Sequence, residues 1–126
     1  MRAVDTNVLL RILTRDDARQ AAAAEAFIGE GSWVSTLALA EVAWVLGAVY
    51  RQPPDQIIKA VAMLLEHRDL TLQDADAVAN ALKVFRERPA LGFSDCLLVE
   101  LARKAGHLPL GTFDRALGKV DGARKL

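Results

Sequence analysis

Apolar and polar positions along the chain predict helices that alternate with short strands. A short apolar run ends at Asp5 and is followed by apolar residues at helical spacing, Val8, Leu9, Ile12 and Leu13, which predicts a strand running into a helix. Further strands are predicted at residues 32–35, 70–73, 108–113 and 123–126. Further helices are predicted at residues 18–28, at 37–51, from 55, from 75 to about 88, and at 95–105.

This alternation is typical of an α/β fold, in which a parallel sheet is covered by helices on both faces. A chain of 126 residues is long enough for one well-packed domain. It contains no internal repeat, low-complexity tract or linker, so we expect a single domain over residues 1–126. No glycine-rich phosphate-binding loop is present, which argues against a dinucleotide or nucleotide triphosphate site.

Composition and charge narrow the class of protein further. Apolar residues make up 52% of the chain, and 16 basic residues balance 16 acidic ones, so the net charge gives no support for nucleic-acid binding. The single cysteine excludes an internal disulfide and a cysteine metal cluster. There is no apolar targeting region at the start and no run of roughly 18 apolar residues. We therefore expect a soluble, cytoplasmic protein without a membrane segment.

Two acids stand at the predicted exits of strands. Asp5 ends the first strand, and Asp114, preceded by Thr112, ends the strand at residues 108–113. Ligands of open α/β sheets bind outside the carboxyl ends of the strands, which makes both carboxylates candidates for chemistry. The alternative is that each acid only caps the helix or turn that follows it.

Two other acids interrupt apolar helical segments. Glu41 is the only charged residue in the apolar stretch 36–50, and an unpaired carboxylate buried there would be costly. The alternatives for Glu41 are a buried salt bridge and a partly exposed rim position. Asp95 opens the helix at 95–105 and is followed by apolar residues; its alternative role is ordinary helix capping together with Ser94.

These four carboxylates together indicate a cation site. If the sheet is parallel, Asp5 and Asp114 lie at the same edge, and the helices that carry Glu41 and Asp95 can face them. So many carboxylates remain ionised together only with a cation between them, and an all-oxygen donor set favours Mg²⁺, with Mn²⁺ as a substitute, over zinc. Neutral groups for outer contacts are Thr6, Asn7 and Thr112. An open Mg²⁺ site held by acids most often serves phosphoryl or phosphodiester chemistry.

The segments around these acids resemble the motifs of PIN-domain nucleases, and specifically the VapC-type toxins of bacterial toxin–antitoxin pairs. The resembling segments are Val4–Leu10, Leu39–Val42, Phe93–Leu98 and Thr112–Asp114. They follow in the family's order and span nearly the whole chain. One departure is Gly92, where many relatives carry another acid.

The resemblance implies a three-layer α/β/α sandwich with a central parallel sheet of four to five strands. It implies a metal-dependent endoribonuclease that forms a homodimer and is inhibited by a small antitoxin. By the same resemblance, Asp5, Glu41, Asp95 and Asp114 hold the metal and a water, and Asn7 and Thr112 support them.

Several basic residues are candidates for contacts with the RNA. Arg115 and Lys119 follow Asp114 and are candidates for phosphate contacts, and Arg11 and Arg15 are further candidates. The alternative for all four is solvated surface charge. Trp33 and Trp44 lie in apolar contexts and are interpreted as core or interface residues. The apolar excess of the helix at 37–51 fits a homodimer or a fully enclosed helix.

Two other functions compete with the nuclease. A receiver-like signalling domain has a similar length and an acidic Mg²⁺ pocket, but it would need an adjacent acid pair after the first strand, and Asp5 is followed by Thr6. A catalytically idle α/β binding module would keep the fold without the chemistry, and the intact carboxylates argue against it.

Overall fold

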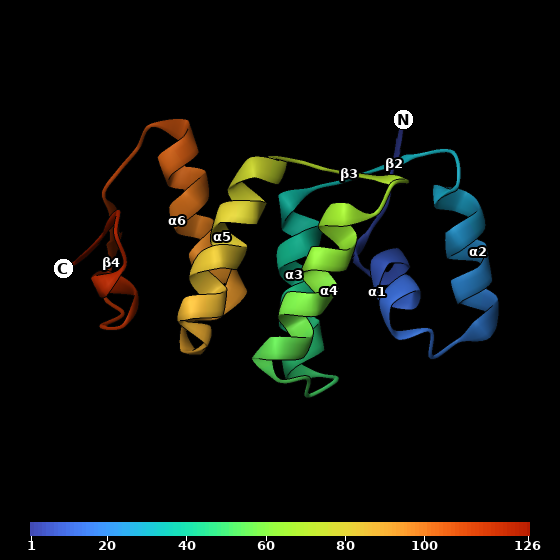
Figure 1. The fold of residues 1–126 in the computed structure, drawn as a ribbon, viewed down its shortest axis with the longest axis horizontal. Helices are drawn as coiled ribbons and strands as arrows, with labels where there is room; N and C mark the ends of the chain where they lie inside the picture. Colours follow the sequence, from blue (N-terminus) through green and yellow to red (C-terminus); the bar gives the residue numbers. More distant parts are fainter. The chain divides into compact units, whose positions relative to one another are not determined.

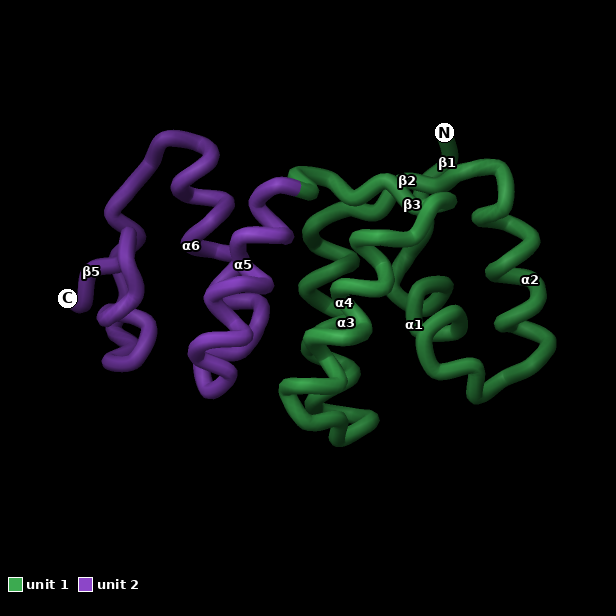
Figure 2. Tube along the Cα trace, viewed as in Figure 1, with its two compact units in different colours: residues 1–75 green, residues 76–126 purple.

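The computed structural model describes residues 1–126 as two compact units, residues 1–75 and residues 76–126 (Figure 2). The first unit contains β1 (Arg2–Ala3), α1 (Thr6–Thr14), α2 (Ala18–Ile28), β2 (Ser32–Val34), α3 (Thr36–Ala48), α4 (Pro54–Glu66) and β3 (Leu70–Leu72). The second contains α5 (Ala75–Glu87), the 3₁₀ helix η1 (Pro89–Leu91), α6 (Phe93–Ala105), β4 (Leu110–Thr112), the 3₁₀ helix η2 (Leu117–Lys119) and β5 (Ala123–Lys125). The boundary between the units falls after Ala75, the first residue of α5.

The first unit is built on a three-stranded parallel sheet in the order β1-β2-β3. Ser32 of β2 is level with Arg2 on one side and with Leu70 on the other. Figure 1 shows α1, α3 and α4 side by side below this sheet, with α2 packed on α1. Their inward residues form a core that includes the fully buried Leu9, Val34, Leu39, Leu46, Val61 and Leu64.

The helices of the first unit begin where polar side chains satisfy their free amide groups. Asp5 caps α1 by accepting a hydrogen bond from the amide of Val8, and Ser35 caps α3 by accepting one from the amide of Ala38. The helix predicted at residues 37–51 therefore begins one residue earlier than the sequence indicated, and Thr36 does not cap it. Thr36 is instead the first helical residue, and its amide donates to the side chain of Gln73.

Helix α3 is not enclosed on all sides. Leu39, Val42 and Leu46 are buried on one face, but Leu37 and Trp44 are exposed on the opposite face. Of the two roles predicted for Trp44, core or interface, the exposure of its side chain excludes the core. The sequence could not distinguish the two, because a helix that is apolar all round gives no period from which its inner face can be identified.

The second unit contains a two-stranded parallel sheet, β4 with β5, and the helices α5 and α6. Phe85 and Phe93 meet edge to face with 6.2 Å between ring centroids, which is a favourable geometry for aromatic rings. A cluster of Val99, Leu117 and Val120 packs α6 against η2 and the turn that follows it.

The α/β class and the parallel strands predicted from the sequence are confirmed. The five strands are divided into sheets of three and two, where the sequence predicted one sheet of four to five. Most element bounds agree within one or two residues. Helix α6 starts at Phe93, two residues before the predicted start, because Gly92 adopts a positive φ of 82° and turns the chain directly into the helix.

A polar cluster joins α1, α2 and the end of α3. Arg11 donates to the carboxylate of Asp16 at 2.8 Å and to the side chain of Gln20 at 2.7 Å. The hydroxyls of Thr14 and Tyr50 donate to the same carboxylate. These two hydrogen bonds, together with the charge of Arg11, lower the pKa of Asp16 from its ordinary value.

We predict that Asp16→Asn destabilises the protein at neutral pH but has little effect in acid. A carboxyl whose pKa is lowered by folding stabilises the protein above its unfolded pKa of about 3.9, and this stabilisation is lost as pH falls through the folded value. Urea unfolding of wild type and Asp16→Asn between pH 7 and pH 3 measures the difference in midpoint. The matched control is Glu66→Gln, an exposed acid without a partner. A difference that is constant across this pH range would contradict the prediction.

Candidate functional site

Asp5 lies between β1 and α1, at the carboxyl end of its strand. Its side chain is exposed, and one carboxylate oxygen, Oδ1, accepts the amide of Val8 at 3.1 Å. The capping role considered as an alternative is therefore real. The other oxygen, Oδ2, makes no hydrogen bond and is open to solvent, so capping leaves half of this carboxylate available for a ligand.

Glu41 lies on α3 and is held by α1. The hydroxyl of Thr6, the residue after Asp5, donates to Oε2 of Glu41 at 2.9 Å. The two meet because β1 and β2 are parallel neighbours, and so α1 and α3 both start at the same edge of the sheet. Glu41 is exposed, as one of the alternatives allowed, and it is not the buried acid that its apolar surroundings suggested.

Asp95 lies in the first turn of α6 and is half-buried. It does not cap the helix, because the cap position belongs to Gly92. Burial raises the pKa of Asp95, and the negative charge of Asp114 raises it further. Asp114 therefore lies close enough to Asp95 to act on its carboxyl electrostatically.

Asp114 follows β4, as the sequence predicted. Its Oδ1 accepts the amide of Leu117 at 2.8 Å and so caps the turn that leads into η2. Its own amide donates to the hydroxyl of Thr112 at 3.0 Å. Thr112 thereby fixes the backbone that carries Asp114, and Oδ2 of Asp114 makes no hydrogen bond.

The donor set fits a hard divalent cation. All four predicted side chains offer carboxylate oxygens, and Asp5 and Asp114 each keep one oxygen unbonded. Such oxygens suit Mg²⁺ or Mn²⁺ better than zinc. Neither unit by itself brings together three Asp, Glu, His or Cys side chains that could hold a metal ion.

The basic residues proposed for RNA contacts differ in their availability. Arg11 is bound to Asp16, Gln20 and Tyr50, and Arg15 forms an ion pair with Glu25. Both guanidinium groups are therefore engaged within the first unit. Arg115 and Lys119, by contrast, are exposed and their side chains form no hydrogen bond or ion pair.

A groove of about 380 Å³ runs between α1 and α2 beside Asp5. Its floor and walls are largely apolar, and Asn7, Arg11 and Gln20 add polar groups. The residues that line it are Asp5, Asn7, Val8, Arg11, Gln20, Ala23, Ala24 and Phe27. It is a surface on which an apolar segment with a polar end would fit.

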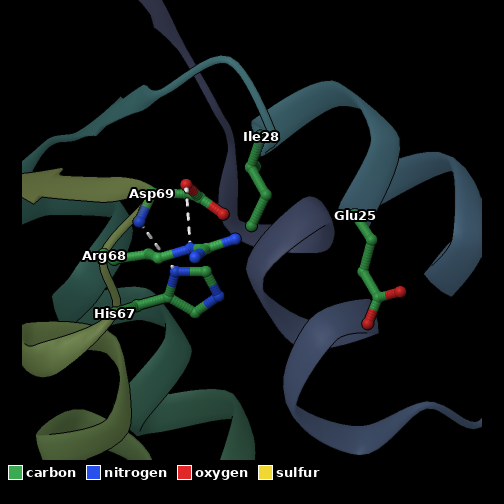
Figure 3. Close-up of a pocket in the computed structure, with 5 residues that line it drawn as sticks. All are labelled: Glu25, Ile28, His67, Arg68 and Asp69. Carbon is green, nitrogen blue, oxygen red and sulfur yellow. Dashed lines mark hydrogen bonds and ion pairs between the residues drawn. The ribbon is translucent and has the colours of Figure 1, made fainter.

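A second pocket of about 390 Å³ lies around the turn between α4 and β3 (Figure 3). Nδ1 of His67 accepts the amide of Asp69 at 3.1 Å, which commits the ring to closing this turn. Glu25 lies across the pocket from the ring, and its carboxylate is paired with Arg15. A histidine-based active site is therefore not supported here.

Sequence reasoning missed two of the groups that organise these regions. The buried acid of the chain is Glu100, which pairs with Arg103 at 3.4 Å, and not Glu41. Tyr50 holds Arg11 and Asp16. A local signal exists for Glu100, because Arg103 is three residues later on the same helix. None exists for Tyr50, which contacts residues more than 30 positions away.

Comparison with protein families identifies the fold. The PIN domain model matches residues 2–123 and so covers both units. The chain belongs to the PIN-domain family. No curated protein and no solved structure matched the chain. None of the helices has the length and apolar character needed to cross a membrane.

Membership of the PIN-domain family sets the class of activity. PIN domains are generally nucleases, act on nucleic acid and typically use divalent metal ions. The family match therefore favours a nuclease over the receiver-like signalling domain considered from the sequence. The matched region contains the four acids predicted from the sequence, along with Thr6, Asn7 and Thr112.

We predict that Asp114→Asn lowers the pKa of Asp95 in the metal-free protein. The substitution removes the neighbouring negative charge, while the contribution of burial remains, so the pKa falls only part of the way to its ordinary value. Titration of the Asp95 carboxyl by ¹³C NMR measures the change. The amide of Asn can replace the capping oxygen of Asp114, which keeps the turn intact. An unchanged pKa would show that the two carboxylates do not interact.

Proposed function

We propose that this PIN domain is an Mg²⁺-dependent endoribonuclease that acts as the toxin of a type II toxin–antitoxin system. The observation that carries the proposal is the presence of all four motif acids within a family match spanning nearly the whole chain. The position of Asp114 near Asp95 adds support, because a cation between two neighbouring carboxylates would stabilise both in their ionised form. We also propose that residues 1–126 function as a single nuclease domain.

In this proposal Asp5, Glu41, Asp95 and Asp114 hold the metal. Mg²⁺ held there would supply a nucleophilic water and would stabilise the negative charge that develops on the non-bridging phosphoryl oxygens and on the leaving oxygen. Mn²⁺ offers the same coordination chemistry and would substitute for it. Removal of any one of the four carboxylates is therefore expected to lower the nuclease activity.

The neighbouring residues position these carboxylates. Thr6 fixes Glu41 through its hydrogen bond, and it restricts which carboxylate oxygen of Glu41 is free. Thr112 fixes the backbone of Asp114. Asn7 lies beside Asp5 in the groove and offers an amide to the substrate or to a bound water. The unpaired cations Arg115 and Lys119 bind RNA phosphates.

The toxin role requires a small antitoxin that blocks the acidic residues. The groove between α1 and α2 supports this part of the proposal, because it combines apolar walls with Arg11 and opens beside Asp5. An antitoxin segment would bury an apolar side chain there and place a polar group near the carboxylate. We propose a homodimer as well, and exposed apolar side chains such as Met63 and Leu98 are candidates for its interface. We place the protein in the cytoplasm, where its RNA substrates are.

We predict that Asp5→Asn lowers the rate of RNA cleavage by at least about 100-fold. Loss of a residue that supports a metal ligand costs about 10- to 100-fold in activity, and loss of a ligand itself is expected to cost more. Cleavage of a mixed RNA pool is measured with Mg²⁺, with Mn²⁺ and with a chelator. Asn caps helices as well as Asp does, so the variant keeps the hydrogen bond to Val8 and its stability. Equal cleavage by wild type and variant would leave the idle binding module as the better description.

A milder variant tests the position of Glu41. Thr6→Val removes the hydroxyl that binds Glu41 but keeps a β-branched side chain of the same size. We expect activity to fall by about 10- to 100-fold, with the folded protein unchanged by circular dichroism. Thr71→Val, an exposed strand residue, is the matched control and should cleave at the wild-type rate. Wild-type activity in Thr6→Val would remove Thr6 from the proposed site.

The toxin role has its own test in cells. Induced expression of the wild-type chain in a bacterial host is expected to stop growth, whereas Asp5→Asn at the same protein level is expected to be tolerated. Colony counts before and after induction measure the effect. Growth arrest by both proteins would contradict a toxicity that depends on cleavage, and arrest by neither would confine the activity to the purified enzyme.

A further inference from the structure

An apolar stripe with a carboxylate in its middle crosses the exposed face of α3. Leu37, Glu41 and Trp44 follow one another at i, i+4 and i+7, which places them within about 60° of one another around the helix. Leu37 is 70% exposed and Trp44 is 65% exposed. An indole that is this exposed buries little apolar surface in the fold, so it is available to a ligand.

The stripe is continuous with the candidate site. Glu41 and Trp44 are one turn apart, with a rise of about 4.5 Å along the helix axis. This is comparable to the roughly 3.4 Å between successive nucleotides of a stacked strand. A nucleotide held at Glu41 therefore has the exposed indole of Trp44 as its neighbour on the same side of α3.

The carboxylate in the stripe argues for RNA over a protein partner. The hydrogen bond that Glu41 accepts comes from a neutral hydroxyl, so a protein interface that covered the whole stripe would have to supply a cation of its own to pair the remaining carboxylate oxygen. A nucleobase needs only the flat face of the indole. It can stack on Trp44 and leave Glu41 hydrated or bound to a cation.

We propose that Trp44 is a stacking platform for an unpaired RNA base next to the cleaved phosphate, an inference that rests on the proposed ribonuclease function. Trp44 thereby selects single-stranded RNA, because the bases of a duplex are already stacked on one another and cannot reach the indole. Its role is to position the substrate.

Fluorescence of Trp44 tests this directly. In the Asp5→Asn, Trp33→Phe background, RNA is not cleaved and Trp44 is the only tryptophan. A 12-nucleotide unstructured RNA pool is titrated in the presence of Mg²⁺, and a duplex of the same length serves as the comparison. We expect the single strand to quench the indole emission and the duplex to leave it unchanged. Unchanged emission while the single strand binds, as measured by polarisation of a labelled RNA, would overturn the proposal.

Substitutions at Trp44 separate stacking from simple apolar contact. Trp44→Leu keeps an apolar side chain but loses the aromatic face, and we expect it to weaken binding of the single strand by about 5- to 150-fold. Trp44→Phe retains an aromatic face and should bind much more tightly than Trp44→Leu. The matched control is Val49→Ala, an exposed apolar residue at the end of α3 that lies outside the stripe. Equal affinity of Trp44→Leu and wild type would overturn the proposal.

Two further measurements separate this proposal from the nuclease itself. If Asp5→Asn abolishes cleavage while Trp44→Leu binds and cleaves like wild type, the nuclease function stands and the stacking role fails. If no RNA is cut but the single strand quenches Trp44, base stacking on Trp44 stands, whereas the nuclease function fails together with the placement of the base beside a cleaved phosphate. Light scattering tests the alternative that the stripe is a dimer interface. If Trp44→Leu turns a dimer into a monomer while its affinity for RNA is unchanged, the stripe binds a second copy of the chain and the stacking proposal fails.

Discussion

The parallel pairing of β1 with β2 is the constraint on which the first unit depends. Parallel neighbours deliver their following helices to the same edge of the sheet, so α1 and α3 begin beside each other although about 30 residues separate their starts. This is why the hydroxyl of Thr6 can reach Glu41. A sheet with antiparallel strands would place the same two residues at opposite ends, and no local feature of the sequence would compensate.

Asp5 and Asp114 show how one carboxylate can serve folding and chemistry together. Each uses one oxygen to close the helical turn that follows and leaves the other unbonded. Capping and ligand binding are therefore compatible roles, although they were weighed as alternatives from the sequence. The cap also restricts the side chain to a single orientation, which lowers the entropy lost when the free oxygen binds a cation.

Local chemistry made much of this structure predictable, and long-range packing set the limit. The cap Asp5, the strand–helix alternation and the acids of the second unit follow from short patterns in the chain. The exposure of Glu41 does not, because a helix that is apolar on every side conceals which face is packed. Similarly, the hydrogen bonds of Tyr50 with Arg11 and Asp16 bring together segments whose proximity depends on how α1 and α3 pack.

The internal ion pairs of Arg11 and Arg15 have a consequence for the kinetics of recognition. Because these guanidinium groups are neutralised by Asp16 and Glu25, and because the whole chain has no net charge, no strong positive field extends into solution to draw in a polyanion. Net electrostatic attraction then adds little to the rate of encounter with RNA, and the proposed phosphate contacts of Arg115 and Lys119 act once the two molecules have met. Selectivity among RNAs resides in how long each complex survives after encounter.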